Sequence, residues 1–257
     1  MRPQKDYPAG KREISRVQAR RELGLRYAAL TDTGKREKNE DAYFAGRMDG
    51  YHLFAVADGL GGHARGEVAS RMAIEILVET VGTDLAESDP AELLGHAFER
   101  INTAIYAYNI DNGLNAGTTL SAAVVDGSGR CWIGTVGDSR TYIITPTSVW
   151  HTRDQTYVQG LVESGAISPA EAMLHPQKHV LTQALGLSAR VQVDLDIAEL
   201  AGGVLLISSD GLHDYVPENA IREIVLEGEP VTACRRLIDA ATDAASTDNI
   251  TVIVARA

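Results

Sequence analysis

Short apolar runs bounded by turn-forming residues make up much of this chain, and such runs predict β-strands. Strands are expected over residues 42–45, 51–57, 119–125, 131–136, 142–145, 191–197, 204–207 and 250–254. The run Leu53-Phe-Ala-Val-Ala57 is apolar at every position, which is typical of a buried strand. The chain is therefore expected to build its core largely from strands.

Apolar residues at helical spacing predict three longer helices, over residues 69–77, 94–108 and 234–241. The second follows Asp89-Pro90, a pair that suits an N-cap and a first helical residue. Two of these helices fall together between strands, so strand and helix do not alternate strictly. This order suits an α+β protein in which paired helices cover two packed antiparallel sheets.

A polar segment, residues 153–179, joins strands without being one. Apolar residues between Val158 and Val162 suit a short helix that ends at Gly165, and Ser168-Pro169-Ala-Glu171 has the pattern of a helix start. An ordinary helical insertion would show the same pattern. The segment is therefore predicted to be helical, with its role open at this point.

Composition limits the class of protein. With 257 residues and 44% hydrophobic content, the chain can bury a core as one large domain or two small ones. No apolar run reaches the length of a membrane span, and no signal peptide is expected. Cys131 and Cys234 lie in apolar segments, which predicts buried free thiols in a reducing, cytoplasmic setting.

The net charge of −11 is unevenly distributed. Residues 1–24 hold seven Lys and Arg against three Asp and Glu, lack an apolar period, and are predicted to be a disordered extension. The remainder is strongly acidic, which argues against a nucleic-acid partner and suits a cation-binding site.

The most informative stretch is Asp58-Gly-Leu-Gly-Gly-His63, which follows the apolar run that ends at Ala57. A carboxylate at a strand end can bind a cation, and glycines let backbone carbonyls approach it without obstruction. Alone, the stretch could equally be a strand-to-helix turn that ends in a surface histidine.

The same pattern recurs at other strand ends. Asp138 follows residues 131–136, Asp210 follows residues 204–207, and Asp248 precedes residues 250–254. A single such aspartate is usually a turn former or a helix cap. Several together predict one rim of oxygen ligands, which selects Mg²⁺, Mn²⁺ or Ca²⁺ over Zn²⁺.

Seven short motifs then appear in a fixed order. They are Arg36-Glu-Lys-Asn-Glu40-Asp41, Ala57-Asp-Gly-Leu-Gly-Gly-His63, Gly117-Thr-Thr-Leu120, Gly137-Asp-Ser-Arg140, Leu181-Thr-Gln-Ala-Leu-Gly186, Ser209-Asp-Gly-Leu212 and Asp248-Asn-Ile-Thr251. This set resembles the metal-dependent protein phosphatase family of the 2C type, in its compact bacterial form. The resemblance implies one phosphatase domain over residues 25–257, folded as a four-layer α-β-β-α sandwich of two antiparallel sheets flanked by helix pairs.

The resemblance also implies two core Mn²⁺ or Mg²⁺ ions and a metal-bridging water that attacks the phosphate. The implied roles are Asp58 as the bridge between the ions, the Gly59 carbonyl on the second ion, Asp210 and Asp248 on the first, and Glu40 and Asp41 as holders of metal-bound water. A third ion is implied at Asp138 and Asp210. Alternatively, Asp138 caps a tight turn and pairs with Arg140.

Two further residues have implied roles in the reaction. Arg36 is expected to clamp the phosphate, because its guanidinium matches two phosphate oxygens. His63 is expected to be the general acid for the leaving alkoxide, because histidine titrates near neutrality. Their alternatives are a surface arginine in a charged loop and a structural histidine.

The resemblance places a mobile flap beside the active site at residues 153–179, where substrate selectivity is expected to arise. The expected function is that of a cytoplasmic, monomeric Ser/Thr protein phosphatase. Its expected partners are phosphorylated proteins, including a cognate Ser/Thr kinase, with no nucleic acid and no membrane. The alternatives are a phosphatase for a small phosphoester or one dedicated regulator, and a catalytically inactive binding module.

Overall fold

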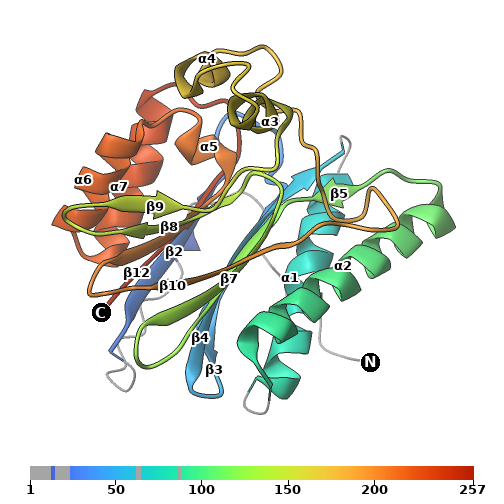
Figure 1. The fold of residues 1–257 in the computed structure, drawn as a ribbon, viewed down its shortest axis with the longest axis horizontal. Helices are drawn as coiled ribbons and strands as arrows, with labels where there is room; N and C mark the ends of the chain where they lie inside the picture. The colour runs from blue at the N-terminus through green and yellow to red at the C-terminus, as the bar shows by residue number, and fades with distance from the viewer. Residues whose placement is uncertain (1–12, 15–23, 62–64, 86–87) are drawn as a thin grey trace.

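Two antiparallel sheets pack face to face in the computed structural model, which describes residues 13–14, 24–61, 65–85 and 88–257 (Figure 1). The first sheet has the strand order β1 (Glu13–Ile14), β2 (Arg26–Asp32), β12 (Ile250–Arg256), β11 (Val204–Ser208), β8 (Arg140–Ile144) and β9 (Val149–His151). The second has the order β10 (Asp194–Glu199), β7 (Arg130–Val136), β6 (Leu120–Val125), β4 (Tyr51–Leu60) and β3 (Asp41–Met48), and β5 (Gly117–Thr118) pairs with β4.

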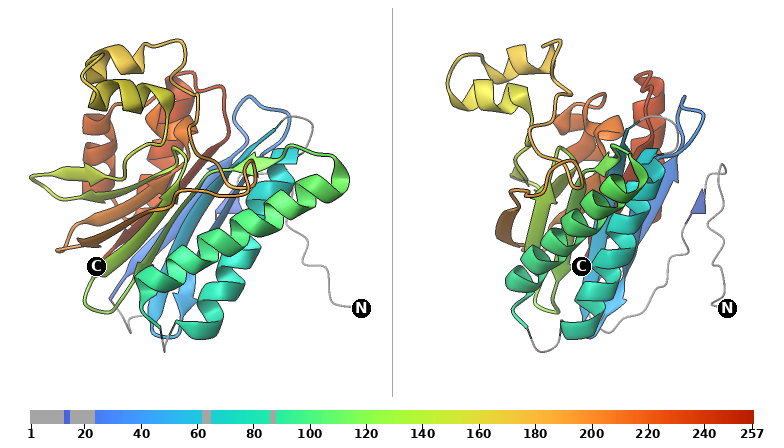
Figure 2. Two further views of the ribbon diagram at one scale, coloured as in Figure 1. Left: turned by 45° about the vertical axis from the view of Figure 1, so that its right-hand side comes forward. Right: turned by 90° about the vertical axis from the view of Figure 1, so that its right-hand side faces the viewer.

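Helices cover both outer faces of this sandwich (Figures 1 and 2). The second sheet carries α1 (Arg65–Asp84) and α2 (Pro90–Asn112), and the first carries α6 (Glu218–Glu227) and α7 (Pro230–Asp243). The short α3 (Tyr157–Glu163) and α4 (Pro169–Met173) lie together at one end, and α5 (Asp210–His213) follows β11 directly. The predicted α+β class and the four-layer α-β-β-α sandwich are confirmed.

The layers explain why several strands are apolar at every position. In β4, Leu53 and Ala55 pack toward α1 and α2, whereas Phe54 and Val56 pack between the sheets. Successive side chains of a strand point to opposite faces, so a strand with both faces covered needs no polar alternation.

Most predicted elements are present, with differences at their bounds. The predicted strand at residues 191–197 is β10, which begins at Asp194 and ends at Glu199. The predicted N-cap of α2 is also present, because the Asp89 side chain accepts a hydrogen bond from the Ala91 amide at 2.8 Å. Cys131 and Cys234 are buried free thiols, as expected.

The sequence reasoning missed β2, β9 and α6. In the first of these only residues 27–30 are apolar, and the strand begins and ends with charged residues. Within the predicted extension of residues 1–24, Glu13–Ile14 pairs with Leu30 and Thr31 of β2. The rest of that extension, apart from Gly24, lies outside the described residues. None of the helices in the described part of the chain is long and apolar enough to cross a membrane.

Candidate active site

Strand ends from both sheets bring the predicted acidic residues to one end of the sandwich. Asp41 begins β3 and lies opposite Asp58 of β4 in the strand register. Asp210 starts α5 directly after the end of β11, Asp248 stands just before β12, and Asp138 occupies the turn between β7 and β8. These carboxylates are close enough for their negative charges to act on one another.

The two carboxylate oxygens of Asp41 have different surroundings. Its Oδ2 atom accepts hydrogen bonds from Ser209 Oγ at 2.9 Å and Thr251 Oγ1 at 2.6 Å. Its Oδ1 atom is buried without a hydrogen-bond partner. Burial, with help from the nearby charges of Asp210 and Asp248, raises the pKa of Asp41 to about 7.

The neighbouring carboxylates are likewise destabilised in their charged form. Burial, followed by the charges of surrounding aspartates, raises the pKa of Asp58 and of Asp138 well above the ordinary value. Burial also raises the pKa of Asp210, whose Oδ1 atom has no hydrogen-bond partner. Unpaired carboxylates in one place repel each other unless a cation joins them. The set therefore fits oxygen-ligated divalent ions.

The glycines of the Asp58 loop bring backbone close to these carboxylates. A Cβ atom at Gly59 would lie 2.3 Å from the carbonyl carbon and oxygen of Gly66, and 2.7 Å from the Glu40 carbonyl oxygen. The Gly59 amide donates to that Glu40 carbonyl at 3.2 Å. A Cβ at Gly66 would lie 2.8 Å from Glu40 Oε2, so the Glu40 carboxylate also packs against these two glycines. This close packing of Gly59, Gly66 and Glu40 fits the predicted roles of Gly59 and Glu40 near an ion.

Arg36 lies on the loop between β2 and β3, with its guanidinium 2.7 Å from Asp248 Oδ2. The loop is held by Asn249, which is buried. Its side chain donates to the carbonyls of Thr33 and Lys38 at 2.8 and 2.9 Å and accepts from the Glu40 amide at 2.8 Å. The loop thus brings Arg36 beside the carboxylates. Its side chain remains half-exposed, so a ligand from solvent can reach the guanidinium. His63 lies outside the described residues.

The turn that carries Asp138 is tied to the start of the 153–179 segment. Gly137 has φ +97°, and a Cβ there would lie 2.6 Å from Thr119 Cγ2, so only glycine fits. The Gly137 amide donates to Gln155 Oε1 at 2.9 Å, and the Gln155 amide donates back to the Gly137 carbonyl at 2.8 Å. Gln155 therefore fixes the turn, although no motif singled it out.

Arg140 does not pair with Asp138. Its guanidinium donates two hydrogen bonds to the carboxylate of Asp154, at 2.7 and 2.6 Å. This pair, which is largely buried, links β8 to the base of the segment. The ion pair expected between Asp138 and Arg140 in the alternative reading is therefore made with Asp154 instead, although the positive charge of Arg140 still acts to lower the pKa of Asp138.

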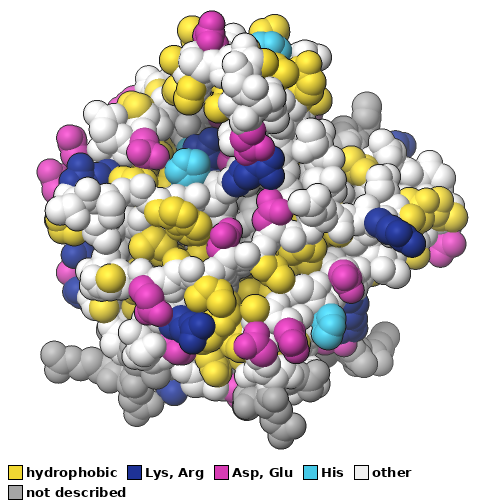
Figure 3. All heavy atoms as spheres, in the orientation of Figure 1, with side chains coloured by type: hydrophobic (Ala, Val, Ile, Leu, Met, Phe, Trp, Pro, Cys, Tyr) yellow, Lys and Arg dark blue, Asp and Glu magenta, His cyan; other side chains and the backbone are white. Residues whose placement is uncertain are grey.

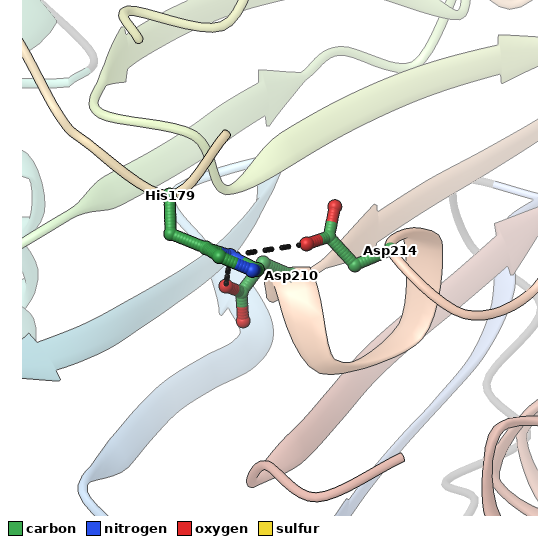
Figure 4. Close-up of side chains that lie close together, drawn as sticks. All are labelled: His179, Asp210 and Asp214. Atoms are coloured by element: carbon green, nitrogen blue, oxygen red, sulfur yellow. Dashed lines mark ion pairs between the residues drawn. The ribbon is translucent and has the colours of Figure 1, made fainter. Parts of the chain in front are cut away.

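The far end of the segment closes on α5 (Figure 4). Lys178 Nζ lies 2.9 Å from Asp214 Oδ2, and His179 Nδ1 lies 3.2 Å from the same oxygen and 3.8 Å from Asp210 Oδ2. In the space-filling view, acidic, basic and histidine side chains gather where this region meets the body of the molecule (Figure 3). Sequence reasoning missed His179, because its position matches no motif and only the fold brings it to Asp210.

Comparisons with known proteins agree with this geometry. A family model described as Protein phosphatase 2C matches residues 33–227. Serine/threonine protein phosphatase PstP of Mycobacterium tuberculosis is 40% identical over 247 residues, which cover 92% of this chain and 46% of PstP. The chain thus spans about half the length of that relative. Protein phosphatase PhpP of Streptococcus pneumoniae is 32% identical over 237 residues, covering 89% of this chain and 96% of PhpP.

A solved structure is also similar. The catalytic domain of PstP, crystallised in complex with two manganese ions, superposes with a TM-score of 0.78 at 37% sequence identity. The match covers 90% of this chain and 97% of that one.

Proposed function

Because the chain belongs to the protein phosphatase 2C family, we propose that it hydrolyses phosphoserine and phosphothreonine in proteins with the help of divalent metal ions. One observation carries the proposal. The Arg36 guanidinium lies at the rim of a set of buried, mutually repelling carboxylates, 2.7 Å from Asp248. A site of this kind can hold cations and a phosphate together.

Mn²⁺ or Mg²⁺ would be held by Asp58, Gly59, Asp210 and Asp248, with Glu40 and Asp41 next to them. When bound, the ions would lower the charge on the phosphate and supply an activated water. The PstP catalytic domain with two manganese ions, and the unpartnered Oδ1 atoms of Asp41 and Asp210, support these assignments. A third ion at Asp138 and Asp210 is supported by the raised pKa of both carboxyl groups. Burial raises these pKa values, and a bound cation would stabilise the charged carboxylates.

The residues of the chain would position and protonate the substrate. Arg36 would orient the phosphate through two parallel hydrogen bonds. His63 would give a proton to the alkoxide oxygen of the departing serine or threonine, a role that rests on the sequence motif. Thr119 would help to hold the backbone of Asp58 in place. Its Oγ1 atom accepts a hydrogen bond from the Asp58 amide at 3.1 Å and lies 2.7 Å from Ser139 Oγ.

The setting of the enzyme is part of the proposal. The substrates would be phosphorylated proteins, including a cognate Ser/Thr kinase, and the enzyme would act as a cytoplasmic monomer. Residues 153–179 would be a flap that selects among substrates. The names of the relatives PstP and PhpP support a protein substrate. The ion pairs that Lys178 and His179 make with Asp214 support the flap proposal.

The experiment is hydrolysis of matched phosphoserine, phosphothreonine and phosphotyrosine peptides after removal of metal with EDTA and return of Mn²⁺. Activity is expected on the first two, only with the ion. Equal rates in rigorously metal-free protein would contradict the metal assignment. Metal-dependent hydrolysis of small phosphoesters with no hydrolysis of phosphopeptides or phosphoproteins would leave the same chemistry with a different substrate class.

A further inference from the structure

The strand β10 forms one edge of the second sheet. It pairs with β7 along its whole length, Asp194–Glu199, and no other strand of the described residues pairs with it. Every second residue of an edge strand turns its amide and carbonyl outward, so such a strand can accept a further strand. In Figure 1, β10 crosses the middle of the face in view, and hydrophobic and acidic side chains gather on this face (Figure 3).

On the face of the sheet that the helices cover, β10 carries an apolar row. Leu195 and Ile197 lie opposite Gly134 and Trp132 of β7 in the strand register. A Cβ atom at Gly95 of α2 would lie 3.6 Å from Leu195 Cδ1, so the helix layer reaches this residue. Leu195 and Ile197 are nevertheless 46% and 55% exposed. The helix layer therefore leaves this apolar row largely uncovered.

On its other face, β10 carries two carboxylates. Asp194 and Asp196 share this face with Ala198, which packs against the core between the sheets. Partial burial and the charge of Asp194 raise the pKa of Asp196. Arg153 Nη1 lies 4.0 Å from Asp194 Oδ2, but the same guanidinium also pairs with Glu163. This face of the edge therefore favours a cationic neighbour.

We propose that β10 accepts an extended segment of the phosphoprotein substrate in which basic and apolar residues alternate. Successive side chains of an added strand lie on opposite faces of the sheet. Its apolar residues would lie beside Leu195 and Ile197, and its lysines or arginines beside Asp194 and Asp196. Apolar pairs and opposite charges both stabilise neighbouring strands. The inference rests on the proposed function, because it takes the docked segment to be part of a phosphorylated protein.

The position of β10 connects this edge with the candidate active site. Asp194, at the start of β10, lies opposite Thr135, and β7 ends at the next residue, Val136. The turn that carries Asp138 follows directly. A segment docked on β10 therefore has one end near the carboxylates proposed to hold the ions. Docking would raise the effective concentration of a phosphate carried by the same chain.

Protection of the edge is a simpler use of the carboxylates. Charged residues keep edge strands from pairing with other copies of a protein. A second copy would bring its own Asp194 and Asp196 to this edge, where like charges repel. Protection alone does not require the exposed Leu195 and Ile197, however. A segment with alternating basic and apolar residues complements both rows, so it is the occupant that the edge favours.

The test is the binding of two unphosphorylated peptides to the full chain in EDTA, measured by fluorescence anisotropy. Lysine and valine alternate in one peptide, and the other has the same composition with its lysines before its valines. The alternating peptide should bind the wild type more tightly than the control peptide does. Asp196→Lys should weaken binding of the alternating peptide about fivefold or more, because attraction becomes repulsion. Asp196→Asn, a milder change, should weaken it in the same direction.

Two controls make this test specific. Glu223→Lys makes the same change of charge at an exposed carboxylate of α6, which covers the other sheet, and should bind as the wild type does. A peptide in which glutamate and valine alternate should bind Asp196→Lys more tightly than it binds the wild type. Equal binding of the alternating and control peptides to the wild type, or unchanged binding in Asp196→Lys, would overturn the proposal.

Hydrogen exchange tests whether the peptide binds as a strand. The alternating peptide should slow exchange of backbone amides within residues 194–199 of the wild type, and less so in Asp196→Lys. Absence of slowing in the wild type would contradict strand addition. A wild-type dimer in which these amides are protected before peptide is added would assign the edge to a second copy and also overturn the proposal.

Kinetics connects docking with hydrolysis. A phosphoserine peptide extended by the alternating segment should have a lower KM than one extended by the control segment, and Asp196→Lys should remove the difference. Equal KM values in the wild type would overturn the role in substrate binding. Mn²⁺-dependent hydrolysis of a phosphoserine peptide without either extension tests the proposed function separately, because the binding test in EDTA requires no catalysis.

Discussion

Asp58 and Asp126 are both aspartates near the ends of strands, but their surroundings differ. Burial and the nearby charges of Asp41 and Asp210 raise the pKa of Asp58. At Asp126, desolvation is the largest single effect, but hydrogen bonds from Ser128 and from backbone amides of the turn together outweigh it and lower the pKa. The first carboxylate is therefore destabilised in its charged form, and the second is stabilised.

This difference predicts opposite effects of the same substitution. Asp58→Asn should lower Mn²⁺-dependent hydrolysis by at least about a hundredfold, since an ion ligand is lost. It should raise the stability of metal-free protein by about 1 kcal/mol, since a repelled buried charge is removed. Asp126→Asn should keep activity and lose about 1 kcal/mol of stability. Steady-state rates and urea unfolding in EDTA measure both, and activity retained by Asp58→Asn would return this residue to a turn-forming role.

The pKa of Asp41, raised by burial to about 7, also predicts a pH dependence of stability. The same carboxyl in the unfolded chain titrates near 3.9, so between about pH 4 and pH 7 the folded state holds a proton that the unfolded chain has lost. Metal-free protein should therefore lose stability as pH rises through this window, by up to a few kcal/mol at about 1.4 kcal/mol per pKa unit.

The comparison of wild type with Asp41→Asn measures this contribution together with the effect of the Asp41 charge on the pKa of Asp58. Burial lowers the pKa of His52 and of His213, which gives the opposite slope below about pH 6.5, but equally in both proteins. Urea unfolding in EDTA across this range should show a shallower fall for Asp41→Asn. Identical slopes in the two proteins would mean that Asp41 is ionised in the folded state without metal.

At the scale of elements, Gln155 joins three segments that the sequence keeps apart. Its side chain accepts from the Gly137 amide, and its carbonyl accepts from the Thr182 amide at 2.8 Å and Thr182 Oγ1 at 2.9 Å. Both ends of the 153–179 segment and the Asp138 turn thus meet at one buried residue. We infer that Gln155 is a positioning residue for Asp138.

Gln155→Met removes the acceptor while keeping the side-chain length. An unsatisfied Gly137 amide should cost about 1–3 kcal/mol and loosen the turn. The Mn²⁺ concentration that gives half-maximal hydrolysis should rise, with less change in the rate at saturating Mn²⁺. Gln159→Met is the matched control, because this partly exposed glutamine of α3 donates its side-chain hydrogen bond to Glu163 on its own helix. A rise of the same size in both variants would assign the effect to the segment as a whole.

The elements that the sequence predicted well are those whose own apolar pattern is strong enough to indicate a strand or a helix. Runs such as residues 53–57 and 204–207 are apolar throughout because both faces are covered. The helix α6 escaped prediction because its buried side chains are only Ile221, Ile224 and Val225, set among charged residues. Short or mixed elements form because the rest of the fold supplies their partners.

The same division applies to the site. The aspartates and Arg36 stand in recognisable motifs at strand ends, so their convergence could be predicted. Gln155 and His179 act through residues distant in the sequence, namely Gly137 and Asp214. No local pattern marks such a residue, because its partner is defined only when the strands have paired.

At the scale of the whole molecule, α4 and its flanking loops are attached to the sandwich without being part of it (Figure 2). This helix buries none of its residues, and Met173 and Leu174 are 65% and 88% exposed. The buried anchors of the region, Gln155 and Val158, precede it in the chain. Residues 166–174 therefore contribute little to the stability of the core.

Replacement of residues 166–174 by a short Gly/Ser linker should leave the fold and the chemistry largely intact, because every proposed ion ligand lies outside them. Hydrolysis of p-nitrophenyl phosphate should stay within about tenfold of the wild type, about 1.4 kcal/mol in barrier. Rates among phosphopeptides of different sequence should change their order, because peptides reach the surface that α4 presents. Steady-state kinetics on both substrate types, with circular dichroism to verify folding, provide the measurement. If small-substrate turnover disappears from a folded variant, α4 belongs to the catalytic machinery; if peptide preferences stay the same, selectivity lies in the sandwich itself.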